Sequence, residues 1–194
     1  NSNIEKVIFL SSTSVYGDTE TISTVIEESE LNPDTESGKQ LVEVENIFRN
    51  NRNFETTIIR FGGLIGEDRN PTKFIDGKTN VANPEAPINF IHQEDCIGII
   101  YEIISCHSDV GRIYSDTNSE KDSSYVRMTN IKVDSIKVWN ETFNAVAPNH
   151  PTRKTYYTQK AIDLNLPKPE FSENEPSIGK IVSSEKLERI LGYK

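Results

Sequence analysis

The sequence predicts an α/β protein with a doubly wound parallel sheet, and three segments carry this prediction. Residues 7–10 form a continuous apolar run, which is typical of a parallel strand buried on both faces. Residues 36–50 have apolar side chains at helical spacing, and residues 56–61 form a second β-branched strand. A strand, a helix and a strand in this order form a right-handed parallel crossover, and hence an α/β sheet.

The first predicted strand needs a neighbouring strand on each side. Residues 1–6 supply none, so we expect the sheet to lack its N-terminal strands and residues 7–10 to form an exposed edge. An edge of this kind recruits another chain. We therefore expect a dimer or an aggregate in solution.

The predicted helix at 36–50 has two candidate N-cap residues, Asp34 and Thr35. Its apolar side chains line one side of the helix. We interpret this stripe as part of the core: Leu41, Val44 and Phe48.

The second half of the chain is predicted to form a small mixed lobe. An irregular stretch at 66–88 marks the boundary, so we divide the chain into a sheet core at 1–66 and a lobe at 67–194 that returns elements to the core. The polar, β-tending segment 112–139 is predicted to be a peripheral hairpin insert. Further elements are expected at 88–91, at 94–105, at 143–146, after Thr152, at 181–183, and in a last helix capped by Ser184 and ending at Leu191-Gly192.

Composition excludes several classes of partner. The formal charge of the 194 residues is −9, and the basic residues are scattered, so no basic stripe is present to bind nucleic acid or an anionic membrane. No segment approaches the roughly 20 apolar residues that a membrane span requires. The two cysteines are too few for a disulfide framework. These features predict a reduced, cytoplasmic protein.

The string SSTSVYG at 11–17 lies at the carboxyl end of the first strand, where ligands bind in open α/β sheets. It resembles the segment that carries the catalytic serine or threonine in the NAD-dependent epimerase/dehydratase family, the extended short-chain dehydrogenases. RFGGLIG at 60–66 and INFIHQED at 88–95 are also similar to segments of this family. The tail, at 144–157 and 179–194, resembles an atypical nucleoside-diphosphate-sugar epimerase-like subgroup.

This resemblance implies a Rossmann-like fold, NAD or NADP as cofactor, and a nucleotide-sugar-like small molecule as ligand. It places the catalytic serine on Ser12, and it groups the remaining candidates by role. The catalytic group is Ser12, Thr13, Tyr16 and Ser37; the residues beside the cofactor are Ser11, Arg60, Gly62 and Gly63; the residues beside the substrate are Leu64, Phe90 and His92. In the family the helix at 36–50 also contributes to a dimer interface, so a homodimer fits this pattern.

The chain departs from the family at the catalytic dyad. The family requires Tyr-x-x-x-Lys on the helix after the serine, because residues i and i+4 share a face and the lysine lowers the pKa of the tyrosine. The matching positions here hold Ser37 and Leu41. Lys39 lies on another face of the helix and is a poor substitute.

A second departure concerns the dinucleotide. The family binds the pyrophosphate with a Gly-x-x-Gly-x-x-Gly turn that opens a helix. The glycines of 62–66 are a different pattern, because no helix follows them. We therefore expect the 194-residue chain alone to bind NAD or NADP in the millimolar range or not at all.

Two other site classes are disfavoured by spacing. His92, Glu94 and Asp95 could suggest a metal, but both acids lie at a predicted helix start, where capping and the helix dipole account for them. A Ser12–His92 hydrolase would need a Gly-x-Ser-x-Gly elbow, which the sequence lacks.

Two hypotheses of function remain. In the first, the protein is an NAD(P)-dependent epimerase or dehydratase in which Ser12 hydrogen-bonds the reacting hydroxyl group. In the second, it is a non-catalytic dinucleotide- or nucleotide-sugar-binding protein that kept the pocket after losing the dyad. The sequence leaves open whether Tyr16 has taken over proton transfer.

Overall fold

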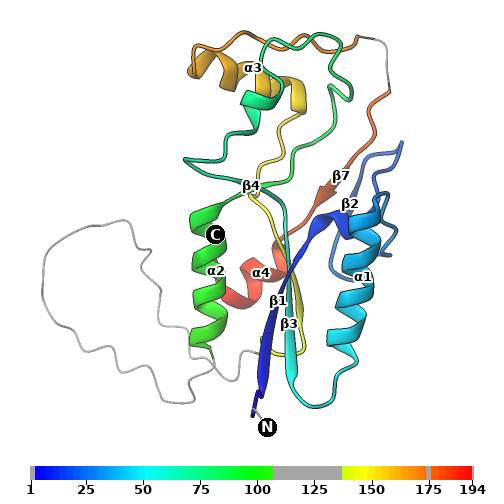
Figure 1. The fold of residues 1–194 in the computed structure, drawn as a ribbon, viewed down its shortest axis with the longest axis vertical. Helices are drawn as coiled ribbons and strands as arrows, with labels where there is room; N and C mark the ends of the chain where they lie inside the picture. Colours follow the sequence, from blue (N-terminus) through cyan, green and yellow to red (C-terminus); the bar gives the residue numbers. More distant parts are fainter. Residues whose placement is uncertain (1–2, 107–136, 174–175, 194) are drawn as a thin grey trace, which may run out of the picture.

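A parallel three-stranded sheet forms the centre of the molecule in the computed structural model, which describes residues 3–106, 137–173 and 176–193 (Figure 1). The strands follow the order β1 (Lys6–Ser12), β3 (Glu55–Phe61) and β6 (Thr142–Ala145). Helix α1 (Glu36–Arg49) connects β1 to β3. The predicted strand-helix-strand crossover and the α/β fold class are therefore confirmed.

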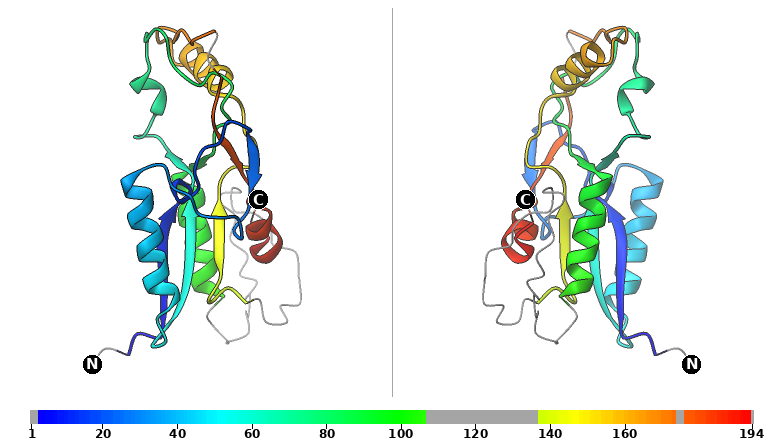
Figure 2. Two further views of the ribbon diagram at one scale, coloured as in Figure 1. Left: turned by 90° about the vertical axis from the view of Figure 1, so that its right-hand side faces the viewer. Right: turned by 90° about the vertical axis from the view of Figure 1, so that its left-hand side faces the viewer.

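Helices cover both faces of this sheet, as a doubly wound fold requires. Helix α1 lies on one face, and α2 (Gln93–Ser105) and α4 (Glu185–Leu191) lie on the other (Figure 2). Successive side chains of a strand point to opposite faces. In β3, Ile59 accordingly packs in the cluster beneath α2 and α4, whereas Arg60 bonds to a side chain of α1.

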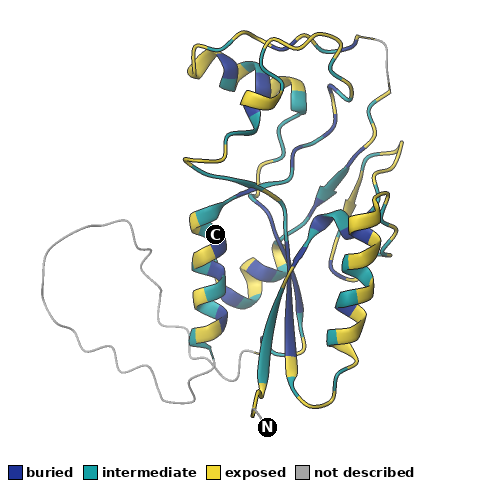
Figure 3. Ribbon diagram, in the orientation of Figure 1, coloured by how far each residue is buried: buried dark blue, intermediate teal, exposed yellow. Residues whose placement is uncertain are grey.

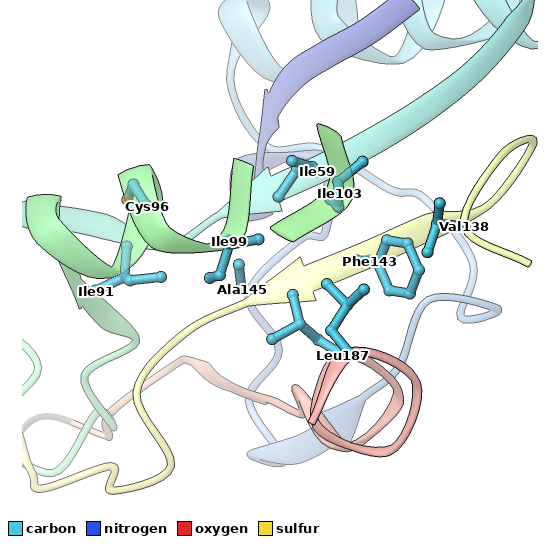
Figure 4. Close-up of a cluster of buried hydrophobic side chains, with 10 residues drawn as sticks. Ile59, Ile91, Cys96, Ile99, Ile103, Val138, Phe143, Ala145 and Leu187 are labelled. Atoms are coloured by element: carbon cyan, nitrogen blue, oxygen red, sulfur yellow. The ribbon is translucent and has the colours of Figure 1, made fainter. Parts of the chain in front are cut away.

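The apolar core lies on the α2 and α4 face (Figure 4). Ile99 and Ile103 of α2 and Leu187 of α4 pack against the sheet and are at most 3% exposed. The cluster as a whole consists of Ile59, Ile91, Cys96, Ile99, Ile103, Val138, Phe143, Ala145, Leu187 and Leu191. This side of the sheet is held mainly by burial of hydrocarbon.

Helix α1 buries a different set of residues from the one that the sequence predicts. It begins after Thr35, whose Oγ1 accepts the Gly38 N–H at 3.1 Å, which confirms one of the two candidate caps. Its buried residues are Gly38 and Glu45. The predicted core stripe of Leu41, Val44 and Phe48 is only half-buried, because the helix turns Glu45 toward the sheet.

Strand β1 is also less buried than predicted. It pairs with β3 along one edge, and no described residue pairs with its other edge. Leu10 is consequently 50% exposed, so the expectation of a strand buried on both faces was wrong (Figure 3). The recruitment of another chain by this edge stays a prediction.

The remaining strands form two short parallel pairs, and a lobe lies beyond the carboxyl ends of the sheet (Figure 1). Helix α3 and the short helix η2 belong to this lobe. The bounds are β2 (Ser23–Val25) with β7 (Lys180–Val182), β4 (Gly63–Ile65) with β5 (Phe90–His92), α3 (Arg153–Asp163), η1 (Thr13–Val15) and η2 (Pro71–Phe74).

The end of the chain follows the predicted pattern with one difference. Gly192 ends α4 in the left-handed conformation, with φ 67°, as predicted for a glycine at this position. Ser184 precedes α4 but makes no capping hydrogen bond, because its Oγ contacts Val146 N (2.9 Å) and O (3.2 Å). The predicted insert at 112–139 lies largely outside the described residues. Within the described ranges, no helix is long and apolar enough to cross a membrane.

Candidate functional site

The carboxyl ends of the strands meet at one edge of the sheet, where open α/β folds bind ligands. The Gly62 N–H, directly after β3, donates to the Ala145 carbonyl at the end of β6 (3.0 Å). Strand β4 then pairs with β5, so that Gly63 lies opposite Phe90. In the same pair Leu64 lies opposite Ile91, and Ile65 opposite His92. The structure thus brings most of the predicted cofactor and substrate residues to one place.

The glycines at this edge are needed for close packing between strands. A Cβ on Gly62 would lie 2.4 Å from the Asn89 carbonyl oxygen, and a Cβ on Gly63 would lie 2.6 Å from the Phe90 ring. Neither glycine has a positive φ. Protein atoms already fill the space beside both residues, so neither glycine leaves room for a pyrophosphate to approach its backbone.

The predicted catalytic serine lies at the end of β1. The Ser12 Oγ accepts the Ser14 N–H at 3.1 Å and caps η1, while its own O–H has no described partner. Thr13, the first residue of η1, is buried. Helix α1 packs against η1, so Ser12 and the start of α1 belong to one local unit.

The first two turns of α1 carry Ser37 and Leu41, the positions to which the resemblance assigns the family's dyad. Ser37 is exposed, and its Oγ lies 3.2 Å from the Thr35 Oγ1. Leu41 is half-buried and supplies no charge. The nearest amine along the helix, Lys39, is exposed and pairs with Glu36 at 2.6 Å. The described part of α1 therefore presents neither a phenol nor a lysine at the two dyad positions.

Behind this edge lies a buried ion pair between α1 and β3. Arg60 binds Glu45 with two hydrogen bonds, from Nε to Oε1 (3.0 Å) and from Nη2 to Oε2 (2.7 Å). Both side chains are 1% exposed. The Ser11 hydroxyl donates to Glu45 Oε1 at 2.7 Å. Two predicted cofactor residues, Ser11 and Arg60, thus have their polar atoms engaged within the protein.

Tyr16 extends this network to β6. Its hydroxyl oxygen accepts from Arg60 Nη1 (2.6 Å), and its O–H lies within donating distance of Asn144 Oδ1 (2.9 Å) and the Ile26 carbonyl (3.0 Å). The residue is 2% exposed. Burial raises the pKa of Tyr16, although Arg60 opposes this shift. A buried phenol with an elevated pKa and two occupied bonding directions is poorly suited to take a proton from a ligand.

The two buried glutamates of the network have pKa values shifted in opposite directions. Burial alone would raise the pKa of Glu45, but hydrogen bonds from Arg60 and Ser11 outweigh it and lower the pKa. Burial raises the pKa of Glu27, and the bond from the Asn144 N–H to Oε1 (2.8 Å) only partly opposes it. The fold therefore lowers the pKa of Glu45 and raises the pKa of Glu27 from their ordinary values.

Sequence reasoning missed three members of this network: Glu27, Glu45 and Asn144. A signal for Glu45 was present, because a carboxylate between Val44 and Phe48 interrupts the apolar side of the helix. An arginine at the end of a buried strand requires a partner of this kind. No local pattern indicated Glu27 or Asn144, which join the network from distant parts of the chain.

Comparisons with solved structures define the class of fold. A short-chain dehydrogenase/reductase superfamily protein from Agrobacterium tumefaciens with bound NAD has a TM-score of 0.66 at 15% identity, over 98% of this chain and 62% of that one. dTDP-glucose 4,6-dehydratase from Bacillus anthracis with NAD gives 0.68 at 14%, over 97% and 56%. MoeE5 with UDP-glucuronic acid and NAD gives 0.67 at 14%, over 99% and 60%. The chain shares the parallel α/β fold of these three proteins, and it spans between 56% and 62% of their length.

Among curated proteins, the chain is similar to Protein YeeZ of Escherichia coli K12 and to its counterpart in strain O157:H7. The identity is 33% over 192 residues in both cases. The match covers 98% of this chain and 58% of the curated protein, so the chain spans less than two thirds of that length. No family model matches the chain.

Proposed function

We propose that the protein binds NAD or NADP and a nucleotide-sugar-like ligand within the epimerase/dehydratase fold, without the hydride-transfer turnover typical of that fold. The observation that carries this proposal lies in the first two turns of α1, where Ser37 and Leu41 stand at the positions that the resemblance assigns to the dyad. The ligands bound to the fold neighbours, NAD and UDP-glucuronic acid, support the ligand class. A content of only two cysteines fits a reducing compartment such as the cytoplasm.

Hydride transfer from a sugar hydroxyl group requires a proton acceptor as well as a hydride acceptor. Oxidation of a sugar hydroxyl releases a proton together with the hydride, so a base must lie beside the hydroxyl group. A serine hydroxyl is too weakly acidic to replace a phenolate near neutral pH, and the phenol of Tyr16 is buried behind the edge. Loss of a positioned acid–base group typically slows such a step by ~10²–10⁴-fold.

The residues of this chain support ligand orientation at the carboxyl edge. Ser12 retains a hydroxyl hydrogen that can bond to a ligand oxygen, and Leu64, Phe90 and His92 adjoin the β4–β5 pair. Because protein atoms fill the space beside Gly62 and Gly63, and because the chain spans 58% of its relative's length, dinucleotide binding is proposed for a protein of the relative's length and not for this chain alone.

A second candidate function is an active epimerase or dehydratase. The position of Ser12 at the end of β1 favours it, because this is where the resemblance places the serine that bonds the reacting hydroxyl. A proton acceptor outside the dyad positions would then be required.

The test introduces the Tyr-x-x-x-Lys dyad into the protein expressed from its complete reading frame. The variant Ser37→Tyr, Leu41→Lys is compared with the parent and with Ser37→Phe, Leu41→Met, which has similar bulk and no acid–base group. Epimerisation of UDP-glucose in the presence of NAD is followed by chromatography. We expect turnover only in the Tyr/Lys variant. Rapid turnover in the parent would instead establish the active enzyme and refute the proposal of a binding protein.

A further inference from the structure

His92 ends strand β5 and points away from the apolar core. Its neighbour Ile91 belongs to the core cluster beneath α2 and is 3% exposed (Figure 4). Because successive side chains of a strand point to opposite faces, Phe90 and His92 share the other side of β5. On that side the Phe90 ring meets Tyr156 of α3, with the ring centroids 5.3 Å apart. His92 therefore lies on the side of β5 that faces the lobe.

One nitrogen of the His92 ring is engaged by the helix that follows. His92 is the N-cap of α2, and its Nδ1 accepts the Glu94 N–H at 3.3 Å. A backbone N–H can only donate, so Nδ1 carries the lone pair and the proton of the neutral ring lies on Nε2. The start of α2 thus fixes His92 as the Nε2–H tautomer.

The carboxylate of Glu94 favours a different protonation state, but it does so weakly. Glu94 Oε2 lies 3.8 Å from His92 Nδ1, and an ion pair between them would require a proton on Nδ1. That proton would face the Glu94 N–H and abolish the cap. The Glu94 side chain is 83% exposed, so the ion pair would contribute little in return. The cap therefore determines the protonation of the ring.

The Nε2–H of His92 is available to a ligand. The side chain is 37% exposed, and Nε2 makes no hydrogen bond with a described residue. The O–H of Ser12 also has no described partner. The ends of β5 and β1 thus each offer a hydrogen to an oxygen atom of a ligand.

His150 carries the opposite tautomer and provides an internal reference. Its Nδ1 lies 3.1 Å from the Ile88 carbonyl oxygen, which can only accept. The proton of the His150 ring therefore lies on Nδ1. The two histidines differ in which nitrogen is protonated, and one spectrum can compare them.

We propose that His92 donates its Nε2–H to an oxygen atom of the sugar in a nucleotide-sugar-like ligand. A sugar oxygen is compatible with the neutral ring, whereas a phosphate would favour the protonated ring, which cannot cap α2. His92 is consequently a ligand-binding donor and not the proton acceptor that an active epimerase or dehydratase would need. This inference rests on the proposed function, because it names one hydrogen bond that holds the proposed ligand.

Nitrogen-15 NMR of the histidine-labelled protein, expressed from its complete reading frame, tests the tautomer without any ligand. The signals are assigned by their absence in His92→Ser and His150→Gln. We expect an unprotonated Nδ1 in His92 and a protonated Nδ1 in His150 near neutral pH. A protonated Nδ1 in His92 would overturn the inference, whatever the protein binds.

Calorimetry then compares UDP-glucose with UDP, which lacks the sugar, in the same protein. His92→Ser keeps an oxygen that can cap α2 but removes the ring, and His150→Gln is the control that removes the other imidazole. We expect the affinity for UDP-glucose to fall about three- to tenfold in His92→Ser, as for loss of one hydrogen bond, and less than about twofold in the control. The affinity for UDP should stay within about twofold in both variants.

His92→Asn and His92→Ala separate the ligand bond from the cap. Asparagine can also cap α2 and replaces His92→Ser if thermal melting shows that the serine variant is misfolded, whereas alanine loses the cap and should melt at a lower temperature than either. Equal affinity of the parent and the capped variants for UDP-glucose would overturn the inference alone, as would an equal loss for UDP. A parent that binds no UDP-glucose would overturn the proposed function as well.

Discussion

At the scale of single residues, the main feature is a charged pair inside the protein. Arg60 and Glu45 are almost inaccessible, and their two hydrogen bonds connect α1 to β3. Removing both charges from water is expensive, so the pair persists only because nearly every polar atom has a partner. Ser11 and Tyr16 supply these further partners. The network thereby ties together the ends of β1, β3 and β6.

Glu45 and Glu27 are both buried, but substitution by glutamine should destabilise the fold much more at Glu45 than at Glu27. Because the fold lowers the pKa of Glu45, its carboxylate contributes stability above the ordinary pKa of roughly 4.3, and this contribution is lost as the pH falls through the folded value. We expect Glu45→Gln to lower the free energy of unfolding by about 3 kcal/mol at pH 7 and to flatten its decline in acid.

For Glu27 the pH dependence of the contribution to stability is reversed. The fold raises the pKa of Glu27, so its contribution is present below the ordinary pKa and is lost as the pH rises through the folded value. We expect Glu27→Gln to change the free energy of unfolding at pH 7 by less than about 1 kcal/mol, since the amide oxygen can still accept from Asn144. Urea denaturation at pH 7 and pH 4 measures both variants. Equal losses of the free energy of unfolding in Glu45→Gln and Glu27→Gln at pH 7 would contradict the different roles assigned to the two glutamates.

Tyr16→Phe separates a structural role from a chemical one. The substitution removes the hydroxyl that bonds Arg60 and Asn144, and we expect a loss of about 1–3 kcal/mol in the free energy of unfolding. Affinity for UDP-glucose should remain within about twofold of the parent, because the hydroxyl does not reach the ligand side of the edge. A fully stable variant that has lost an activity present in the parent would identify Tyr16 as the proton acceptor.

At the scale of elements, α1 and α2 each contain a glycine, and the two glycines have different surroundings. A Cβ on Gly38 would lie 2.6 Å from the Ser14 carbonyl oxygen, which is backbone. A Cβ on Gly98 would meet the Tyr193 hydroxyl at 2.6 Å, at the free end of a side chain near the C-terminus. The Ser14 carbonyl belongs to the backbone of η1 and cannot move away from Gly38 by itself. The Tyr193 side chain can move away from Gly98 by rotation about its own bonds.

Alanine should therefore destabilise the fold more at Gly38 than at Gly98. In an exposed helix, glycine to alanine stabilises by roughly 0.5–1 kcal/mol. We expect Gly98→Ala to approach neutrality, and Gly38→Ala to destabilise by about 1–3 kcal/mol because it forces α1 away from η1. Thermal denaturation of the two variants provides the comparison. A Gly38→Ala variant as stable as the parent would show that α1 and η1 are not held as closely as their contacts indicate.

Much of the element structure could be predicted from sequence, because it depends on local signals. The cap at Thr35, the crossover strands and the glycine after α4 follow from patterns within a few residues. The burial of α1 could not be predicted, because it depends on Arg60, a residue in the next strand. The β4–β5 pair was likewise missed, since three-residue strands separated by an irregular segment carry too weak a pattern.

At the scale of the whole molecule, the site is composed of contributions that lie far apart in the sequence. The structure brings Ser12, Gly62 and Phe90, which the resemblance selected, to the carboxyl edge of the sheet, because parallel strands place their carboxyl ends together. The resemblance could not reveal that Tyr16 and Arg60 turn into the interior, since both positions match the family motif. The carboxyl edge holds the residues that the resemblance selected, whereas Ser37 and Leu41 lack the acid–base groups of the dyad. This difference is the basis for proposing binding without turnover.

The most direct test of that proposal is the absorbance of reduced nicotinamide after the protein of full reading frame is mixed with NAD and UDP-glucose. We predict that both compounds bind, as calorimetry on the same sample would register, and that rapid mixing shows no reduced cofactor even transiently, while chromatography shows no sugar product. UDP-glucose 4-epimerase, whose NAD is reduced only until the hydride returns to the sugar, serves as the positive control for both measurements. Reduction of NAD in proportion to the protein would contradict the account, because it would require a proton acceptor that Ser37, Leu41 and Tyr16 do not supply.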